Sequence, residues 1–231
     1  MDEERTKENE MLSDKEWASL LKTSAIYSCE DEYKLFVFAY FLSFPIPTSF
    51  EQGVILIDDK FYSLTDKFIN SFEEDEKCRI NFQKCWDYLH DGSKFKVGLS
   101  QNNASRFISI LSKLNASEDI ISSIFYSTMA LEAVYARGMS EGISRQIIDK
   151  VKIFLCTDID EKKLKKIYDI RSHYIHGDSE IQLAFLDYDV DKKDELYELF
   201  SYICDLLYNT AKRIIEENLS KIDFDYTIKL S

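Results

Sequence analysis

Along the 231-residue chain, a strand-like hydrophobic pattern is followed by a helical one. Residues 53–64 are rich in β-branched and aromatic side chains on both sides of Asp58-Asp59-Lys60, which predicts two short strands joined by a turn. From about residue 103 onward, apolar side chains recur every three or four positions, as in amphipathic helices. The pattern therefore predicts a mainly α-helical protein with a smaller α+β region at its N-terminus.

The predicted N-terminal region, residues 1–102, contains helical segments beside the strands. Residues 13–43 have a helical pattern that Ser13 can cap, and we expect a second helix to begin at Glu32. Pro45 ends this pattern because proline cannot continue a helix. Further elements are a helix over residues 71–86, a turn containing His90, and strands over residues 95–99 and 223–230.

The predicted C-terminal region, residues 103–231, follows a boundary near residues 98–103, where Gly, Ser, Gln and Asn cluster. Ser117 can cap one of its helices, and Gly138 can end the same helix. Mostly short connections between long helices favour an antiparallel bundle. The helices are expected over residues 103–114, 117–135, 143–155, 160–176 and 191–218.

Composition excludes several kinds of protein. The five cysteines are scattered and contain no Cys-x-x-Cys pair, so we expect reduced, mostly buried thiols and no zinc site. Gly-rich phosphate loops, Gly-x-Ser-x-Gly motifs and histidine-rich metal patterns are absent, and we expect no metal and no cofactor. A net charge of −13 argues against broad nucleic-acid binding, so any RNA contact should be local.

The first ten residues are charged where a signal peptide would need an apolar core, and no apolar run has the length of a membrane span. We therefore expect a protein that is neither exported nor anchored in a membrane. This expectation, together with the cysteine pattern, favours a cytoplasmic location.

The segment from Tyr168 to Gly177 carries the strongest chemical signal, because it contains two of the three histidines and an arginine. Arg171 can hold a phosphate with two parallel hydrogen bonds, and His176, five positions later, can move a proton near neutral pH. This pair of side chains suits metal-independent cleavage of RNA.

Three blocks of sequence resemble the Apea-like branch of the HEPN domain family. They are Glu132 within Ala130-Leu131-Glu132-Ala133, residues 142–148, and residues 165–177, which contain the Tyr-Asp-x-Arg-Ser-x-x-x-His-Gly string. The resemblance covers roughly residues 103–218. It implies a helical bundle that forms a homodimer in which the Arg-x-x-x-x-His motifs of two subunits face one another. Many HEPN members are metal-independent endoribonucleases of toxin-antitoxin, CRISPR-associated or antiphage systems.

By this resemblance Arg171 and His176 are the catalytic pair, and Ser172 occupies a position that is usually polar in the family. On an ideal helix Arg171 shares a largely apolar face with Tyr168, whereas His176 lies about 140° around the axis, so the two motif side chains do not stack unless the last turn loosens. His173 is a closer neighbour of His176. We expect supporting roles for four residues, which are Ser172, His173, Glu132 and Tyr168.

In the expected reaction, His176 acts as base on a ribose 2′-OH or as acid on the leaving oxygen, and Arg171 holds the scissile phosphate. The products would be a 2′,3′-cyclic phosphate and a 5′-hydroxyl. A lysine cluster upstream of the motif could collect RNA phosphates. Its members are Lys162, Lys163, Lys165 and Lys166.

Each signal also has a purely structural interpretation. Arg171 can pair with Glu132 or Asp169 inside the bundle, Glu132 can either stabilise the core or orient Arg171, and a lysine cluster is often a solvated helix face. The competing function is a non-catalytic HEPN-like dimerisation or adaptor subunit. An acidic surface fits that function, and it also fits a toxin bound by a basic antitoxin or a subunit of a defence complex.

Overall fold

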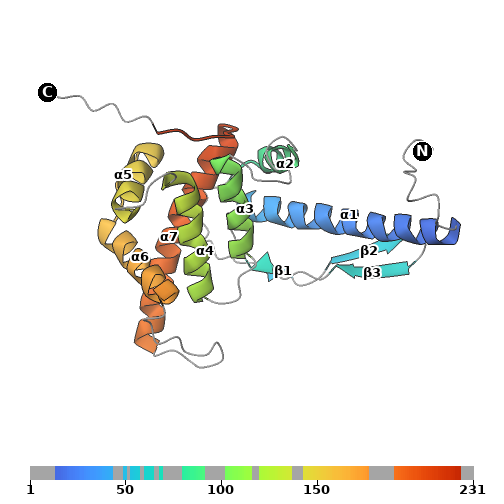
Figure 1. Cartoon of the computed structure of the whole chain (residues 1–231), viewed down its shortest axis with the longest axis horizontal. Helices are drawn as coiled ribbons and strands as arrows, with labels where there is room; N and C mark the ends of the chain where they lie inside the picture. Colours follow the sequence, from blue (N-terminus) through green and yellow to red (C-terminus); the bar gives the residue numbers. More distant parts are fainter. Residues whose placement is uncertain are drawn as a thin grey trace.

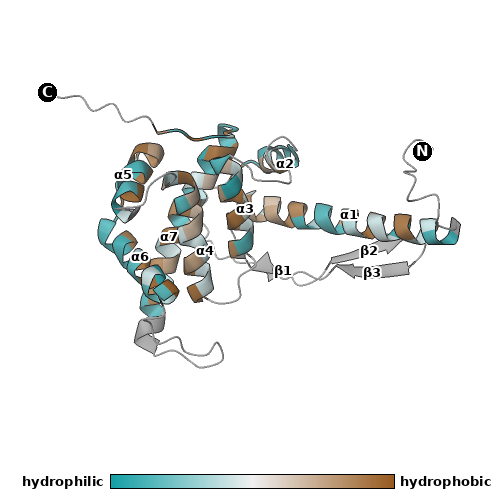
Figure 2. Ribbon diagram, in the orientation of Figure 1, coloured by the Kyte–Doolittle hydropathy of each residue, from teal (hydrophilic) through white to brown (hydrophobic). Residues whose placement is uncertain are grey.

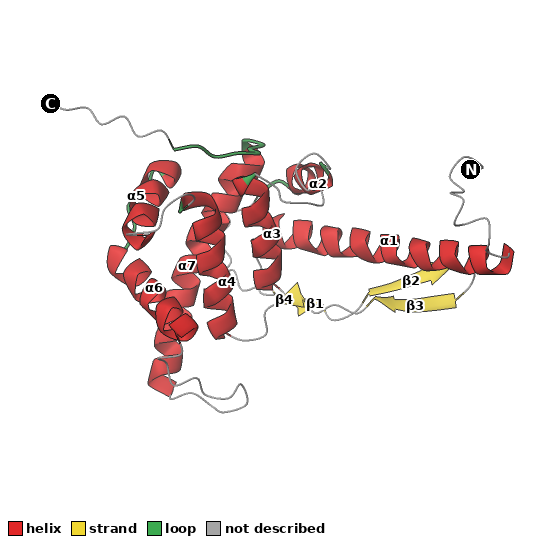
Figure 3. Cartoon of the chain, viewed as in Figure 1, coloured by secondary structure: helices red, strands yellow, loops and turns green. Residues whose placement is uncertain are grey.

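The computed structural model of the chain is mainly α-helical, with a group of packed helices from which one long helix projects (Figure 1). Helices dominate the view coloured by secondary structure, with two pairs of short strands beside them (Figure 3). The structure describes residues 14–43, 49–50, 53–57, 60–64, 68–69, 80–91, 102–115, 120–136, 143–176 and 190–224.

Helix α1 (Asp14–Ser43) is continuous, whereas the sequence predicted a second helix starting at Glu32. The acidic stretch Glu30-Asp31-Glu32 contains no glycine or proline, so nothing in it interrupts the helical backbone. An ion pair between Glu30 and Lys34, at 3.2 Å and one turn apart, bridges this stretch. Burial begins only at Val37, and most of the preceding part of α1 extends beyond the other helices (Figure 1).

Two antiparallel strand pairs follow α1 in the chain. Strand β1 (Ser49–Phe50) pairs with β4 (Phe68–Ile69), and β2 (Gly53–Ile57) pairs with β3 (Lys60–Leu64). Strands β2 and β3 fall within residues 53–64, for which the sequence predicts two strands.

Helix α2 (Phe82–His90) starts later and ends later than the predicted helix over residues 71–86. The side chain of Asn81 accepts a hydrogen bond from the Lys84 backbone N–H at 3.1 Å and so caps the helix start. The expectation that His90 belongs to a turn was wrong, because His90 is the last helical residue. Its Nδ1 contacts the Trp86 carbonyl oxygen at 3.0 Å.

The five helices predicted after residue 103 are present, with ends close to those expected. Helix α4 is apolar on nearly all sides and packs against each of the other four, so it is the centre of this group (Figure 2). The helices are α3 (Asn103–Asn115), α4 (Ile120–Tyr135), α5 (Ile143–Leu155), α6 (Glu161–His176) and α7 (Val190–Glu216).

One hydrophobic core extends across the predicted boundary near residues 98–103. It includes Phe38 from α1 and Tyr88 from α2 together with Leu131 from α4. The Tyr88 hydroxyl also donates to the Leu219 carbonyl oxygen at 2.8 Å. The end of α1 and helix α2 therefore pack on the helices that follow them.

Asn103, the first residue of α3, joins the helices to the C-terminal segment. Its side-chain amide donates to the Ile222 carbonyl oxygen at 2.8 Å, and its side-chain oxygen accepts from the Ile222 backbone N–H at 2.9 Å. Both residues are buried, so water does not compete with this pair of hydrogen bonds.

Some sequence predictions lie wholly or largely outside the described residues. They are the caps and ends at Ser13, Pro45, Ser117 and Gly138, the turn at residues 58–59, the strands over 95–99 and 225–230, and Cys78. Residues 223–224, at the start of the predicted C-terminal strand, do not form a strand. Of the four described cysteines, Cys85 and Cys204 are buried, and Cys29 and Cys156 are exposed.

None of the helices built from the described residues combines the length and apolar character that crossing a bilayer requires. Within the same residues, no three His, Cys, Asp or Glu side chains come together in a group that could hold a metal ion.

Candidate functional site

The start of the motif helix α6 is fixed by three hydrogen bonds of Asp160. The carboxylate of Asp160 accepts hydrogen bonds from the backbone N–H groups of Lys162 and Lys163 at 3.0 and 3.1 Å. The backbone N–H of Asp160 donates to the Tyr202 hydroxyl on α7 at 2.8 Å. This N-cap agrees with the predicted start near residue 160 and sets which α6 side chains face the other helices.

The apolar side of α6 faces the bundle. Leu164 and Ile167 are fully buried, and Tyr168 is 9% exposed. Near the end of the helix, the ring of Tyr174 lies 6.0 Å from that of Phe125 on α4. Arg171 occupies the turn between these contacts, so its side chain lies at the edge of the apolar interface.

Arg171 pairs with Glu132 of α4, one of the two partners considered from the sequence. The distance from Nη2 of Arg171 to Oε2 of Glu132 is 3.4 Å, and the two side chains are 27% and 23% exposed. Burial raises the pKa of the Glu132 carboxyl, and the nearby charge of Arg171 opposes this effect. Glu132 is also the only charged residue in the sequence of α4, a signal from which a special role could have been inferred.

Three buried polar atoms on α4 and α6, two of them in the ion pair itself, have no hydrogen-bond partner within the described part of the chain. They are Oε1 of Glu132, the hydroxyl oxygen of Tyr168 and Nε of Arg171. Burial raises the pKa of Tyr168 well above its usual value; the charge of Glu132 raises it further, while Arg171 opposes the shift. The Tyr168 hydroxyl is therefore a protonated donor. The sequence predicted a supporting role for Tyr168, but it did not indicate a buried hydroxyl without a hydrogen-bond partner.

His176 is the last residue of α6, and its side chain is exposed. Because the helix remains α-helical up to this residue, Arg171 and His176 stay about 140° apart around its axis. Within one chain, the two predicted catalytic side chains therefore point in different directions.

His173 and Ser172 lie between the two motif residues. Nδ1 of His173 contacts the Asp169 carbonyl oxygen at 2.6 Å, and since that oxygen can only accept, Nδ1 carries the proton. In the neutral ring, Nε2 of His173 is then an acceptor. Ser172 follows Arg171 in α6 and is partly exposed.

The predicted lysine cluster is largely paired with carboxylates. Lys163 contacts Glu198 of α7 at 2.7 Å, and Lys166 forms an ion pair with Glu195 of the same helix. Lys165 lies 3.6 Å from Glu161. Lys162 is exposed and forms no side-chain ion pair with the other described residues. These contacts favour a solvated, charge-balanced helix face over a strongly basic surface.

The two glutamates of α7 that pair with the lysine cluster were not identified from the sequence. Glu195 and Glu198 are three residues apart and so lie on one side of a helix. This spacing was a visible signal, but nothing in it indicates that α6 is the neighbour.

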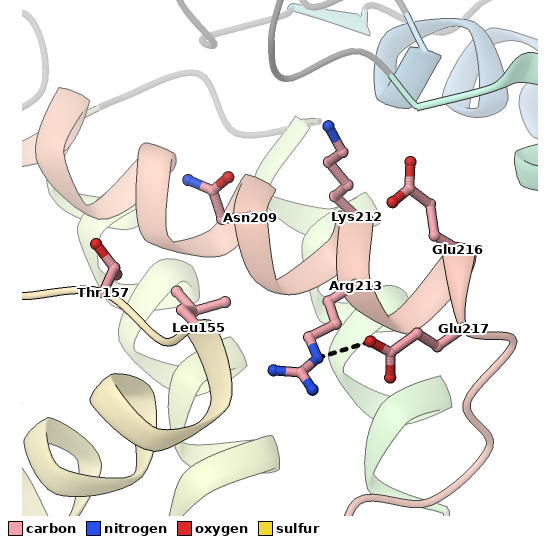
Figure 4. Close-up of a pocket in the computed structure, with 7 residues that line it drawn as sticks. All are labelled: Leu155, Thr157, Asn209, Lys212, Arg213, Glu216 and Glu217. Atoms are coloured by element: carbon pink, nitrogen blue, oxygen red, sulfur yellow. Dashed lines mark hydrogen bonds and ion pairs between the residues drawn. The ribbon is translucent and has the colours of Figure 1, made fainter.

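A surface pocket of about 310 Å³ lies elsewhere, between the end of α5 and the last turns of α7 (Figure 4). Its two cations, Lys212 and Arg213, are balanced by Glu216 and Glu217. Arg213 donates to Glu217 at 2.9 Å and to the Phe154 carbonyl oxygen, which caps the end of α5. The pocket therefore has no excess positive charge for a phosphate, and we place the candidate site at Arg171.

Comparison with known proteins gives no match to a protein family, to a curated protein or to a solved structure. The interpretation of the site therefore rests on its own residues. These residues offer a guanidinium at the edge of the bundle, a carboxylate that holds it, and two exposed histidines in the following turns.

Proposed function

We propose that this protein is a metal-independent endoribonuclease of HEPN type. The observation that carries the proposal is the position of Arg171, which lies at the partly exposed edge of the bundle and contacts the carboxylate of Glu132. A guanidinium held in this way is restrained in orientation and still accessible to a phosphate oxygen. The exposed His176 at the end of the same helix supplies a group that can transfer protons.

The reaction requires two chains, because Arg171 and His176 of one chain point in different directions. In a homodimer with facing motif helices, the histidine of one subunit removes the proton from the ribose 2′-OH, and the 2′-oxygen bonds to phosphorus. The bond from phosphorus to the 5′-oxygen breaks, and the histidine of the other subunit protonates that oxygen. Arg171 stabilises the negative charge that develops on the phosphate.

RNA contacts outside the catalytic centre should be few, given the net charge of −13 and the ion pairs of the lysine cluster. Lys162 is the cluster member best able to bind a phosphate, while the other lysines must first leave a carboxylate. By analogy with HEPN nucleases, we propose a cytoplasmic toxin or antiphage effector. An antitoxin or another defence protein would then restrain it, with the N-terminal α+β region as the docking part.

The test is cleavage of total RNA and tRNA by the purified protein in EDTA, with analysis of the product ends. We expect cyclic phosphate ends, and losses of at least about 100-fold for Arg171→Ala and His176→Ala. His90→Ala is the matched control and should cut RNA like the unmodified protein, because this exposed histidine ends α2 and lies outside the motif. Equal cleavage by the His176→Ala variant would contradict the proposal.

The second candidate is a non-catalytic dimerisation or adaptor subunit. It is favoured by one specific observation, which is that Arg171 and three of the four lysines already have carboxylate partners. In this case Arg171→Ala would change stability or assembly, and neither the unmodified protein nor any variant would cut RNA, even with its cellular partner present.

A further inference from the structure

We propose that Tyr168 takes over the Glu132 carboxylate when Arg171 turns to an RNA phosphate, so that the ion pair seen here is a resting state. This inference rests on the proposed ribonuclease function and adds a means of regulation to the same site. Tyr168 would be a positioning residue, since it acts on the substrate only through Glu132 and Arg171.

The first step of the argument concerns the contact that must break. Arg171 and Glu132 are joined by a single contact of 3.4 Å, although a guanidinium and a carboxylate can form two parallel hydrogen bonds of about 2.8 Å. Nε of Arg171 and Oε1 of Glu132, which a two-bond arrangement would engage, have no hydrogen-bond partner among the described residues. The pair is thus close enough to restrain Arg171 without using its full bonding capacity.

The second step concerns what Arg171 would leave behind. The Glu132 side chain is only 23% exposed and projects from an otherwise uncharged helix. A carboxylate that loses its cation in such surroundings is strongly disfavoured unless another donor replaces it. Release of Arg171 therefore needs a second donor near Glu132.

The third step identifies that donor. The Tyr168 hydroxyl is buried and has no hydrogen-bond partner in the described part of the structure, and it belongs to α6, which packs against the helix that carries Glu132. It lies one turn before Arg171 on the same helix, so both side chains approach α4 from the same side. A hydrogen bond from Tyr168 to Glu132 would satisfy both idle oxygens and leave the guanidinium free for phosphate.

Binding of a mixed-sequence 2′-O-methyl RNA oligonucleotide, measured by fluorescence anisotropy, tests this exchange without cleavage. We expect Tyr168→Phe to weaken binding about tenfold, because Glu132 then has no replacement donor. Glu132→Gln should tighten binding, since a neutral amide holds Arg171 less strongly. In the Glu132→Gln background, adding Tyr168→Phe should change affinity by less than about twofold.

Stability separates this role from a structural one. Since the hydroxyl has no hydrogen-bond partner in the resting state, Tyr168→Phe should leave the urea midpoint unchanged or raise it. A lowered midpoint, unchanged RNA affinity, or the same loss of affinity in the Glu132→Gln background would each overturn the exchange. If Arg171→Ala binds RNA weakly while Tyr168→Phe binds normally, only the exchange fails. If the unmodified protein binds no RNA, or Arg171→Ala binds as well as it does, the proposed function fails too.

Discussion

Helix α6 forms ion pairs on two sides, and the two pairs differ in their exposure to water. On the exposed side, Lys163 lies 2.7 Å from Glu198, with the two side chains 34% and 65% exposed. On the side facing the bundle, Arg171 lies 3.4 Å from Glu132, and both side chains are at most about a quarter exposed. The more exposed ion pair, between Lys163 and Glu198, therefore has the shorter distance between its charged atoms.

This difference shows why distance is a poor guide to the importance of an ion pair. Water screens exposed charges and can replace either partner, so such pairs contribute little to stability. A half-buried pair resists replacement, because each charge depends on the other for compensation. A change of partner should therefore affect stability at the pair between Arg171 and Glu132, although its contact is the longer one.

The largest expected effect comes from breaking the half-buried pair. Arg171→Ala leaves the Glu132 carboxylate without its cation, and we expect a loss of about 1–3 kcal/mol in the free energy of unfolding, measured with urea. Lys163→Ala is the matched control from the exposed side and should give no measurable loss. Equal losses for the two variants would show that the two sides do not differ as described.

A smaller loss is expected from the cap at the start of α6. Asp160→Ala removes the acceptor for the N–H groups of Lys162 and Lys163 and should cost about 1 kcal/mol. Hydrogen exchange should accelerate in the first turn, which carries the lysines, and remain slow at Tyr168. Faster exchange throughout α6 would mean that the two sides are not independent.

The pH dependence of stability tests the half-buried side alone. Burial raises the pKa of Glu132 above its usual value of 4.5, so the folded protein holds this proton more tightly than the unfolded chain. The contribution from protonation is full below pH 4.5 and is lost as the pH rises through the folded-state pKa. The free energy of unfolding of the unmodified protein, relative to Glu132→Gln, should therefore fall by less than about 1 kcal/mol as the pH rises from 4.5. A rise over this range would mean that Arg171 outweighs burial.

The smallest effect is expected for salt acting on the exposed side. Lys166→Gln removes the ion pair with Glu195, and its urea midpoint should differ from that of the unmodified protein by no more than about 0.2 M. Added salt should abolish even this difference, because it screens exposed charges. A difference that persists in 1 M NaCl would indicate that this pair is not purely electrostatic.

The bounds of the helices were predictable where the pattern was purely local. Helix α5 occupies the predicted residues 143–155, because its apolar spacing alone defines it. The division of α1 at Glu32 was wrong, because the residues around Glu32 include no glycine or proline whose backbone properties would have stopped the helix.

The candidate site was only partly predictable. The pairing of Arg171 with Glu132 was one of two options, since both residues were singled out in the sequence. The ion pairs with Glu195 and Glu198 depend on α7 lying beside α6, and that is decided by the common core rather than by either helix. The position of the Tyr168 hydroxyl near Glu132 likewise depends on how α4 and α6 meet.

The paired hydrogen bonds between Asn103 and Ile222 close a loop of 119 residues without a covalent bond. Closing so long a loop in a flexible chain has a substantial entropic cost. In the folded protein the helices between the two residues already hold them together, so the hydrogen bonds form without this cost. A fragment of residues 102–224 would keep both sides of this closure. Truncation of the whole chain at residue 218 would remove Ile222 from the core, the partner of Asn103, and the Leu219 carbonyl group that Tyr88 binds, so residues 219–222 count for more than their number suggests.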